Sequence, residues 1–472
     1  MERESMEFDV VIVGAGVTGL SAACRLMQKA QEQEQELTVC VVEKGSEVGA
    51  HILSGAVMET RALDELFPDW QEREAPITCK VTSEDTFLLL NETKGIKLPG
   101  FAVPKPMHNK GNYIVSLANV TRWMGEQAEA LGVEIFPGFP ASEILYHEDG
   151  SVKGIATGDM GVGADGVPKD SYTQGMELHA KYTLFTEGVR GHLGKQLLER
   201  FELDKDKDPQ HYAIGIKELW DIDPAKSKPG LVVHGSGWPL TDGASGGFFL
   251  YHDEGNQVEV GLIVDLNYSN PWLSPFDEFQ RFKHHPEVKQ YLEGGTRVSY
   301  GARAITKGGL NCLPKMTMPG AFILGCNAGT LNFAKIKGIH TGMKSGMLAA
   351  EVIADALKAG DEGRKDLTQF AQAYQDSWLH DELYRGRNFG PAMHKYGTFL
   401  GGTFNFIDQN IFAGKIPLTL HDTHKDHEML KPALIPKNWN TLSLTVSCHL
   451  ISCRRCTCPM PVMKRISLAT CA

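Results

Sequence analysis

Three glycines near the N-terminus have the spacing of a phosphate-binding turn. Residues 8–20 read FDVVIVGAGVTGL, in which Gly14, Gly16 and Gly19 follow the pattern G-x-G-x-x-G directly after an apolar run. The first glycine permits a tight turn, the second lets a pyrophosphate approach the backbone, and the third lets the helix pack on the strand. The spacing therefore predicts a dinucleotide at a helix N-terminus, where free N–H groups favour anions.

An acidic residue completes this predicted unit. Residues 37–42 (LTVCVV) predict a second buried strand, and Glu43 follows it directly. A carboxylate in that place is suited to accept a hydrogen bond from a ribose hydroxyl. The alternative is a glycine-rich loop in an unrelated α/β protein, which leaves the order of strand, turn, helix, strand and acid unexplained. Because the unit stands at the N-terminus, it favours FAD over NAD.

Two later glycine turns are expected to approach the same cofactor. Residues 179–201 predict a strand, a turn at Thr186–Gly188 and a helix, and residues 321–357 predict a strand, a glycine-rich loop and a helix. The helix N-terminus would stabilise negative charge on a reduced flavin ring. The alternative is a core helix whose small residues serve close packing. The expected FAD contacts in these two turns are Gly188, Gly325, Gly329, Gly338, Ile339 and Thr341.

The elements that must position these residues alternate along the whole chain. Its 472 residues are enough for two or three domains. Residues 210–300 alternate like an antiparallel sheet, which predicts a second domain inserted into an α/β FAD domain with a Rossmann-like sheet. We expect the FAD domain at 1–75, 108–200 and 300–357, the inserted domain at 76–107 and 201–299, a helical region at 358–437 and an aberrant tail at 438–472.

Composition excludes several other functions. The net charge of −11 argues against a nucleic-acid partner. The five cysteines before residue 437 lack metal-ligand spacing, and no apolar run is long enough to cross a bilayer. The sequence also lacks a Ser/His/Asp set, a Cys/His nucleophile pair and a second dinucleotide fingerprint. We therefore predict no catalytic acid or base and no metal ligands.

From about residue 6 to about residue 432, the chain resembles the electron transfer flavoprotein–ubiquinone oxidoreductase family. The resemblance is carried by long stretches such as VVEKGSEVGAHILSGAV (41–57), HNKGNYIVSLANV (108–120) and NPWLSPFDEFQRFKHHP (270–286). It implies an FAD enzyme that takes electrons from electron transfer flavoprotein and reduces ubiquinone at a membrane. The alternatives are an FAD-dependent reductase of isoprenoid chains and an inactive truncated product that binds FAD.

The resemblance also implies where the acceptor and the membrane lie. The glycine pair against which the family places the quinone headgroup matches Gly246 and Gly247; without the resemblance, a turn before a strand is the simpler interpretation. The two segments that enter one membrane leaflet match residues 50–70 and 387–406, although a buried helix explains the second equally well. No mitochondrial transit peptide precedes the first strand, so we expect a bacterial, monotopic protein on the cytoplasmic face of the inner membrane.

The family pattern breaks after Pro436. The family carries a [4Fe–4S] cluster on four cysteines, whereas here Cys453 and Cys456 are followed by Cys458, one residue too close for the family's run. A zinc or iron–sulfur site is one interpretation. The other is out-of-frame translation, because codons for residues 463–467 can be read one frame over as His-Glu-Glu-Asp-Gln, which fits the family at this point. On that interpretation the cluster ligands are absent and the tail has no selected hydrophobic pattern.

Overall fold

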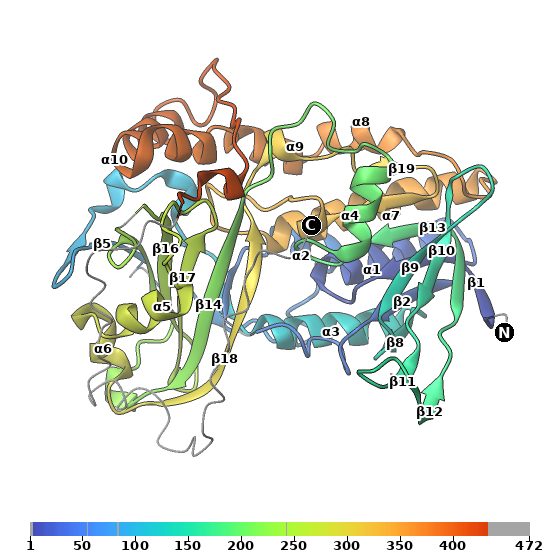
Figure 1. The fold of residues 1–472 in the computed structure, drawn as a ribbon, viewed down its shortest axis with the longest axis horizontal. Coiled ribbons are helices and arrows are strands. Elements are labelled where there is room, and N and C mark those ends of the chain that lie inside the picture. Colours follow the sequence, from blue (N-terminus) through green and yellow to red (C-terminus); the bar gives the residue numbers. More distant parts are fainter. Residues whose placement is uncertain (1–2, 54, 83–84, 242, 433–472) are drawn as a thin grey trace.

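The computed structural model describes residues 3–432 except residues 54, 83–84 and 242. The predicted tail and the cysteines after Pro436 lie outside the described residues. Two large sheets lie side by side along the long axis of the molecule (Figure 1). The mixed sheets and helices confirm the predicted α/β class with a two-domain FAD fold.

The first glycine turn follows the central strand β1 of an eight-stranded, largely parallel sheet. The β1 strand pairs in parallel with β13 and β2, with Val10 opposite both Tyr182 and Val39. Every residue from Val10 to Val13 is buried, as expected for a parallel strand covered on both faces. Across the sheet the strands are β19 (Thr317–Met318), β20 (Ala321–Ile323), β13 (Glu177–Phe185), β1 (Ser5–Val13), β2 (Val39–Glu43) and β8 (Glu134–Pro137), with β10 (Val152–Thr157) on β13 and β9 (Ala141–Tyr146) on β10.

Helices that follow the glycine turns cover this sheet. The helices α1 and α7 pack closely because Gly342 and Gly346 of α7 face Thr18 of α1, leaving no room for larger side chains. The helices of this half are α1 (Val17–Glu32), α2 (Arg61–Leu66), α3 (Leu117–Ala130), α4 (His192–Arg200) and α7 (Ile339–Lys358). Two small sheets flank it, one of β3 (Ala56–Met58), β7 (Tyr113–Val115) and β4 (Cys79–Lys80), the other of β11 (Met160–Val162) and β12 (Pro168–Thr173).

The second large sheet is the antiparallel sheet expected from residues 210–300. One face carries Phe248 and Leu250, which lie in one core with Phe279 and Phe282 of α5 (Pro275–Lys283) and with Val288 and Leu292 of α6 (Pro286–Leu292). Across this sheet the strands are β18 (Thr296–Thr306), β14 (Tyr212–Asp221), β17 (Gln257–Asp265), β16 (Gly246–His252), β15 (Val232–Gly237), β5 (Asp85–Leu90) and β6 (Gly95–Lys97).

The sheets depart from the expected domain boundaries at two points. The β18 strand stays paired with β14 as far as Thr306, so it runs through the expected boundary at residue 300. Cys79 and Lys80 pair with β7 rather than with the seven-stranded sheet, although residues 76–107 were expected to belong to the inserted domain. In both places the partner is distant in sequence, and local patterns carry no signal of it.

The chain continues after α7 into helices that bridge the two halves. These are α8 (Gln369–Gln375), α9 (Trp378–Arg385) and α10 (Phe389–Asn410). A break at Gly397, with φ of 71° and ψ of −179°, divides α10 into two arms. Figure 1 shows α10 above the seven-stranded sheet, beside the segment that holds η1 (Gly100–Ala102) and η2 (Lys105–Met107). The helix therefore lies next to the inserted sheet and away from the hairpin of β11 and β12.

Candidate functional site

The three glycines of the first turn have different surroundings. Gly14 has φ of +103°, and its N–H donates to the carbonyl of Val42 at 2.8 Å, which closes the turn. Gly16 caps α1, and no atom lies within 4 Å of the place where a Cβ would stand. A Cβ on Gly19 would lie 2.7 Å from Thr186 Oγ1 and would overlap the Gly14 carbonyl. Gly16 alone leaves open space, which fits a pyrophosphate at the N-terminus of α1.

Glu43 stands at the end of β2, as predicted, but its carboxylate is already anchored. Ala15 N–H donates to Oε2 at 3.0 Å, and Gly45 N–H donates to Oε1 at 2.7 Å. Each carboxylate oxygen can accept a further hydrogen bond. The two backbone bonds fix the orientation of the carboxylate and leave it able to receive a ribose hydroxyl.

The second glycine turn meets the first through Thr186. Its hydroxyl donates towards the carbonyls of Val13 and Gly14, at 2.8 Å and 3.0 Å, and its N–H donates to Val13 at 3.0 Å. Gly188 has φ of +82°, with no atom near its Cβ position. Thr186 thus joins the ends of β1 and β13, and sequence reasoning did not assign it this role. A polar residue two positions before a predicted turn glycine was the available signal.

The third glycine turn approaches α1 from the other side. Gly325 has φ of +62° and lies against the side chain of Thr18, while Gly329 has φ of +95° and lies against Gln210. Gly338 caps α7, which begins at Ile339, and Thr341 donates its hydroxyl to the Gly338 carbonyl at 3.1 Å. The structure therefore brings the predicted residues of the first and third turns together around the N-termini of α1 and α7.

A partly buried charge cluster holds the start of α7. Lys335 Nζ lies 2.8 Å from a carboxylate oxygen of Glu59 and 2.8 Å from one of Glu382, and His340 Nε2 lies 2.6 Å from Glu382. Burial disfavours the charge on Glu382, but hydrogen bonds from His340 and Lys335 outweigh it and bring its pKa to about 2. The cluster ties α7 to α9 and to the chain before α2. The sequence analysis missed it because its members are far apart along the chain.

The predicted quinone glycines are enclosed by neighbouring strands. A Cβ on Gly247 would lie 2.8 Å from the Gly235 carbonyl, and one on Gly246 would overlap the Ile263 carbonyl. Gly246 also has φ of +148°, a conformation that larger residues rarely adopt. Close packing by itself accounts for both glycines, so their role towards quinone stays a prediction.

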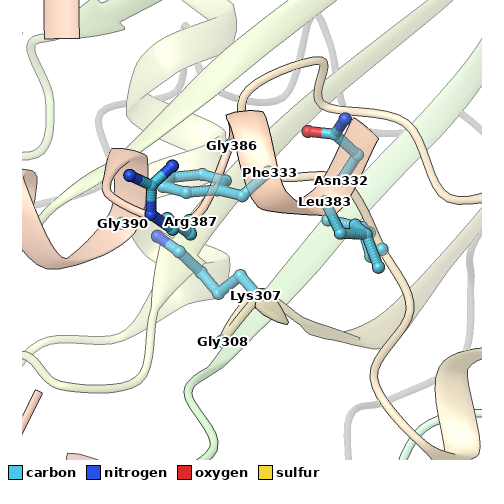
Figure 2. A pocket seen from close by; sticks show the side chains of 10 residues that line it. Lys307, Gly308, Asn332, Phe333, Leu383, Gly386, Arg387 and Gly390 are labelled. Atoms are coloured by element: carbon cyan, nitrogen blue, oxygen red, sulfur yellow. The ribbon is translucent and has the colours of Figure 1, made fainter. Parts of the chain in front are cut away.

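Two hollows lie near these elements, and neither is lined by the predicted FAD glycines. The first, with a volume of only about 10 Å³, lies between the loop after β18, the loop before α7, and the helices α9 and α10. Figure 2 shows Lys307, Phe333 and Arg387 around it, with the Lys307 ammonium 4.1 Å from the centre of the Phe333 ring. The second, with a volume of about 20 Å³, is lined by β5, the segment of η1 and η2, and His234 of β15.

An apolar surface covers the outer side of α10. Phe399 is 86% exposed and Leu400 is 65% exposed, and Phe101 of η1 is 81% exposed. Lys105 N–H donates to Asn410 Oδ1 at 2.8 Å, which joins the η1–η2 segment to the end of α10. We call Phe101, Tyr396, Phe399, Leu400, Ile407, Ile411 and Phe412 the α10 surface. Within the described residues, no helix is both long and apolar enough to span a bilayer.

The other predicted membrane segment, residues 50–70, does not form such a surface. Met58, Leu63, Phe67 and Trp70 are all buried in the core of the FAD half. Trp70 donates its indole N–H to Asp64 at 2.8 Å, and Phe67 packs edge-on against Trp123. These four side chains are therefore turned away from any membrane, whereas Ile52 and Leu53 are only partly buried, and membrane contact at that end of the segment stays a prediction.

The cysteines with described positions do not form a cluster site. Cys24, Cys40, Cys79 and Cys312 are buried and free, and Cys326 is partly buried and free. Burial raises the pKa of the Cys24 thiol to about 12, so it stays protonated. Two groups of histidines and carboxylates, at His211 and at His340, have the composition of cation sites. In each, ion pairs among the side chains already supply the positive charge, and we assign no metal.

We call the three glycine turns together with Glu43 the cradle. Comparison with known proteins identifies the family of the chain that forms it. Residues 9–58 match the family described as FAD dependent oxidoreductase, and residues 212–305 match ETF-QO, ubiquinone-binding. An electron transfer flavoprotein-ubiquinone oxidoreductase of Pseudomonas aeruginosa is 67% identical over 434 residues, which cover 92% of this chain and 79% of that protein. The chain belongs to the electron transfer flavoprotein-ubiquinone oxidoreductase family.

Mitochondrial members of this oxidoreductase family are also similar to the chain in sequence. The mitochondrial electron transfer flavoprotein-ubiquinone oxidoreductase of Bos taurus is 52% identical over 440 residues, covering 92% of this chain and 71% of that protein. A geranylgeranyl bacteriochlorophyll reductase-like structure from Thermoplasma acidophilum aligns with a TM-score of 0.63 at 16% identity, over 90% of this chain and 96% of that one. At that identity the likeness shows the fold alone. The chain is accordingly an FAD-dependent oxidoreductase.

Proposed function

We propose that this chain accepts electrons from reduced electron transfer flavoprotein and reduces ubiquinone to ubiquinol. The observation that carries the proposal is the cradle beside Gly16, where open space lies at the N-terminus of α1 in a chain of this family. FAD held there supplies a centre that can take up and release electrons singly or in pairs. No residue is assigned as a general acid or base.

Different residues of the cradle are assigned to different parts of FAD. We assign the pyrophosphate to the free N–H groups beside Gly16, and the ribose to Glu43. Gly188, Gly325 and Gly329 lie on the turns that approach α1. The N-terminus of α7, at Gly338, Ile339 and Thr341, is assigned to the flavin ring, where the helix dipole favours negative charge.

The acceptor is assigned to the inserted sheet. Gly246 and Gly247 lie within the stretch that matches the ubiquinone-binding family, at the start of β16. Gly247 shares one face of the sheet with Phe249 and Tyr251, since side chains alternate along a strand, and the opposite face is covered by α5 and α6. We place the quinone headgroup on the face that carries Gly247.

We further propose that the α10 surface rests in one leaflet of a membrane, on the cytoplasmic face of the bacterial inner membrane. Phe399, Leu400 and Phe101 are large apolar side chains left in water by the fold, and they lie on two segments joined by Asn410. Such a surface fits a monotopic protein that meets quinone at the bilayer.

The [4Fe–4S] cluster that the resemblance implies is given no part in this chain. The described cysteines are scattered, with Cys24 and Cys40 in the core of the FAD half and Cys79 against the seven-stranded sheet, and they supply no ligand set. No electron step is assigned through a cluster, and Cys448, Cys453, Cys456, Cys458 and Cys471 lie outside the described residues.

Two measurements test the proposal. The purified chain, reduced photochemically under argon, is mixed with a soluble ubiquinone analogue, and we expect the flavin absorbance to return as quinol forms. In a steady-state assay with reduced electron transfer flavoprotein, we expect quinone reduction above that of Gly16→Val. A bound flavin that ubiquinone does not reoxidise would refute the proposal. If the reduced flavin instead reduced a double bond of an isoprenoid chain, the result would favour the alternative function, an FAD-dependent reductase of isoprenoid chains.

A further inference from the structure

Lys337 carries a buried positive charge without a carboxylate beside it. Three lysines in the described part of the chain are buried, namely Lys283, Lys307 and Lys337. Lys283 lies 2.9 Å from Glu218 and Lys307 lies 2.6 Å from Asp265. The Lys337 ammonium, in a residue that is 5% exposed, instead donates to Asn109 Oδ1 at 2.5 Å and to the Lys335 carbonyl at 3.1 Å.

The position of this ammonium is set from two sides. Lys337 directly precedes Gly338, the cap of α7, so its backbone belongs to the loop assigned to FAD. Asn109 belongs to the segment before β7 and is held by Asp85, the first residue of β5 in the seven-stranded sheet. The charge therefore lies where the flavin loop meets the sheet assigned to quinone.

Asp85 orients the amide that receives the ammonium. Asn109 N–H donates to Asp85 Oδ2 at 2.6 Å, and Asn109 Nδ2 donates to Asp85 Oδ1 at 2.9 Å. These two bonds direct the amide oxygen of Asn109 towards Lys337. The Asp85 carboxylate thus reaches Lys337 only through Asn109, whose neutral amide lies between the carboxylate and the ammonium.

A buried charge is costly when no opposite charge accompanies it. Burial outweighs the longer-range attraction of Glu59, Asp85 and Glu382 and lowers the pKa of Lys337 to about 8, which still leaves most of the side chain protonated at pH 7. A cation kept in this state attracts any negative charge that forms nearby. Reduction of a flavin creates such a charge, which a cation near N1 of the ring stabilises.

We propose that Lys337 stabilises negative charge on the reduced flavin, with Asn109 and Asp85 as the residues that position it. The inference rests on the proposed FAD site and adds a source of positive charge to the dipole of α7. It explains why the loop before α7 keeps a lysine in a place where the fold provides no carboxylate partner.

The test measures how readily the bound FAD is reduced. The full chain with bound FAD is equilibrated at pH 7 with a reference dye, and the fraction of reduced flavin is read by absorbance. For Lys337→Met we expect the ratio of reduced to oxidised FAD at one ambient potential to fall about tenfold, which is about 30 mV for a two-electron couple. Lys337→Gln should behave in the same way, and Lys337→Arg should keep most of the wild-type ratio.

Lys344→Met is the matched control. It removes a lysine seven positions further along, in the second turn of α7, but this ammonium pairs with Glu65 and lies against the Trp378 ring. We expect its ratio of reduced to oxidised FAD to stay within about twofold of wild type, because a partnered charge contributes little net field. FAD content and thermal melting of every variant are measured alongside.

Three results would overturn the inference. The first is an unchanged ratio in Lys337→Met and Lys337→Gln with FAD fully bound. The second is an equal fall in Lys344→Met, which would indicate a general effect of charge. The third is loss of FAD from both neutral variants, which would make Lys337 a residue that holds the cofactor. Failure of the unaltered chain to reduce ubiquinone would defeat the proposed function alone, since this measurement needs only bound FAD.

Discussion

Gly16 and Gly19 belong to one motif, yet they meet different neighbours. Gly16 faces open space, whereas Gly19 is enclosed by the Gly14 carbonyl and the Thr186 hydroxyl. A side chain at Gly19 would force α1 away from β1, which is a change in packing. A side chain at Gly16 would fill the place assigned to the pyrophosphate and leave the protein contacts intact. The two positions therefore separate the stability of the fold from the binding of the cofactor.

We predict that Gly16→Val lowers the FAD content of the purified chain to less than about a tenth of wild type, because the valine side chain blocks backbone approach to the pyrophosphate. Flavin absorbance per chain after purification measures this. Gly402→Val is the matched control, since its Cβ also meets no atom within 4 Å and it lies in α10. Full flavin occupancy in Gly16→Val would show that the cofactor does not lie at this turn.

The segment after α10 is held to the start of β14 by His211 and to α10 by His394. His211 Nδ1 lies 2.6 Å from Asp426, and its Nε2 lies 3.2 Å from Asp422, which also receives His394 at 3.0 Å. Burial opposes the charge on His211, but hydrogen bonds to the two aspartates raise its pKa to about 9. The protonated ring of His211 therefore joins the segment to the start of β14 at neutral pH.

This pairing predicts a dependence of stability on pH. Because the folded pKa of His211 exceeds the unfolded value, its contribution is complete below about pH 6.5 and is lost as the pH rises through about 9. We expect the free energy of unfolding to fall over this window by on the order of 3 kcal/mol, measured by urea denaturation. His211→Gln should be less stable at pH 6 and lack most of this slope. An equal slope in wild type and variant would contradict the assignment.

The α10 surface makes a second prediction for a single element. Phe399→Asp with Leu400→Asp should release the chain from phospholipid vesicles, because charge in the interface costs more than the apolar contact it replaces. Co-sedimentation measures the bound fraction. Val167→Asp with Tyr172→Asp is the matched control, since both residues are exposed on the β11–β12 hairpin, at the other end of the molecule from α10 (Figure 1). Unchanged binding of the α10 variant would remove this surface from the membrane contact.

At the scale of the whole molecule, the prediction concerns the iron–sulfur cluster of the family. The match covers 79% of the Pseudomonas aeruginosa relative. We predict that the 472-residue chain contains less than about a tenth of an equivalent of cluster iron and acid-labile sulfide, because its tail lacks the ligand spacing of the family. A gene whose frame is shifted after codon 437 should yield a chain that contains the cluster and reduces quinone faster with electron transfer flavoprotein. Equal rates would show that the cluster is dispensable.

The sequence alone determined the local units of this protein. The order of strand, glycine turn, helix and acid at residues 8–43 predicted β1, α1 and β2, and the glycine-rich loop before Ile339 predicted the start of α7. These predictions succeed because a turn glycine and an alternating apolar pattern act on their immediate neighbours. The family resemblance supplied the acceptor and donor, which no local pattern specifies.

Tertiary structure decided which distant residues meet. Thr186 closes the first turn from 172 positions away, and Lys337 finds Asn109 across 228 positions. Phe101 joins the exposed face of α10 through Asn410, and Leu63, Phe67 and Trp70 turn inward. Such contacts depend on how sheets and helices pack, and packing is set by the sum of many weak interactions over the whole core. No single stretch of sequence carries that sum, so these parts of the site emerged only from the folded chain.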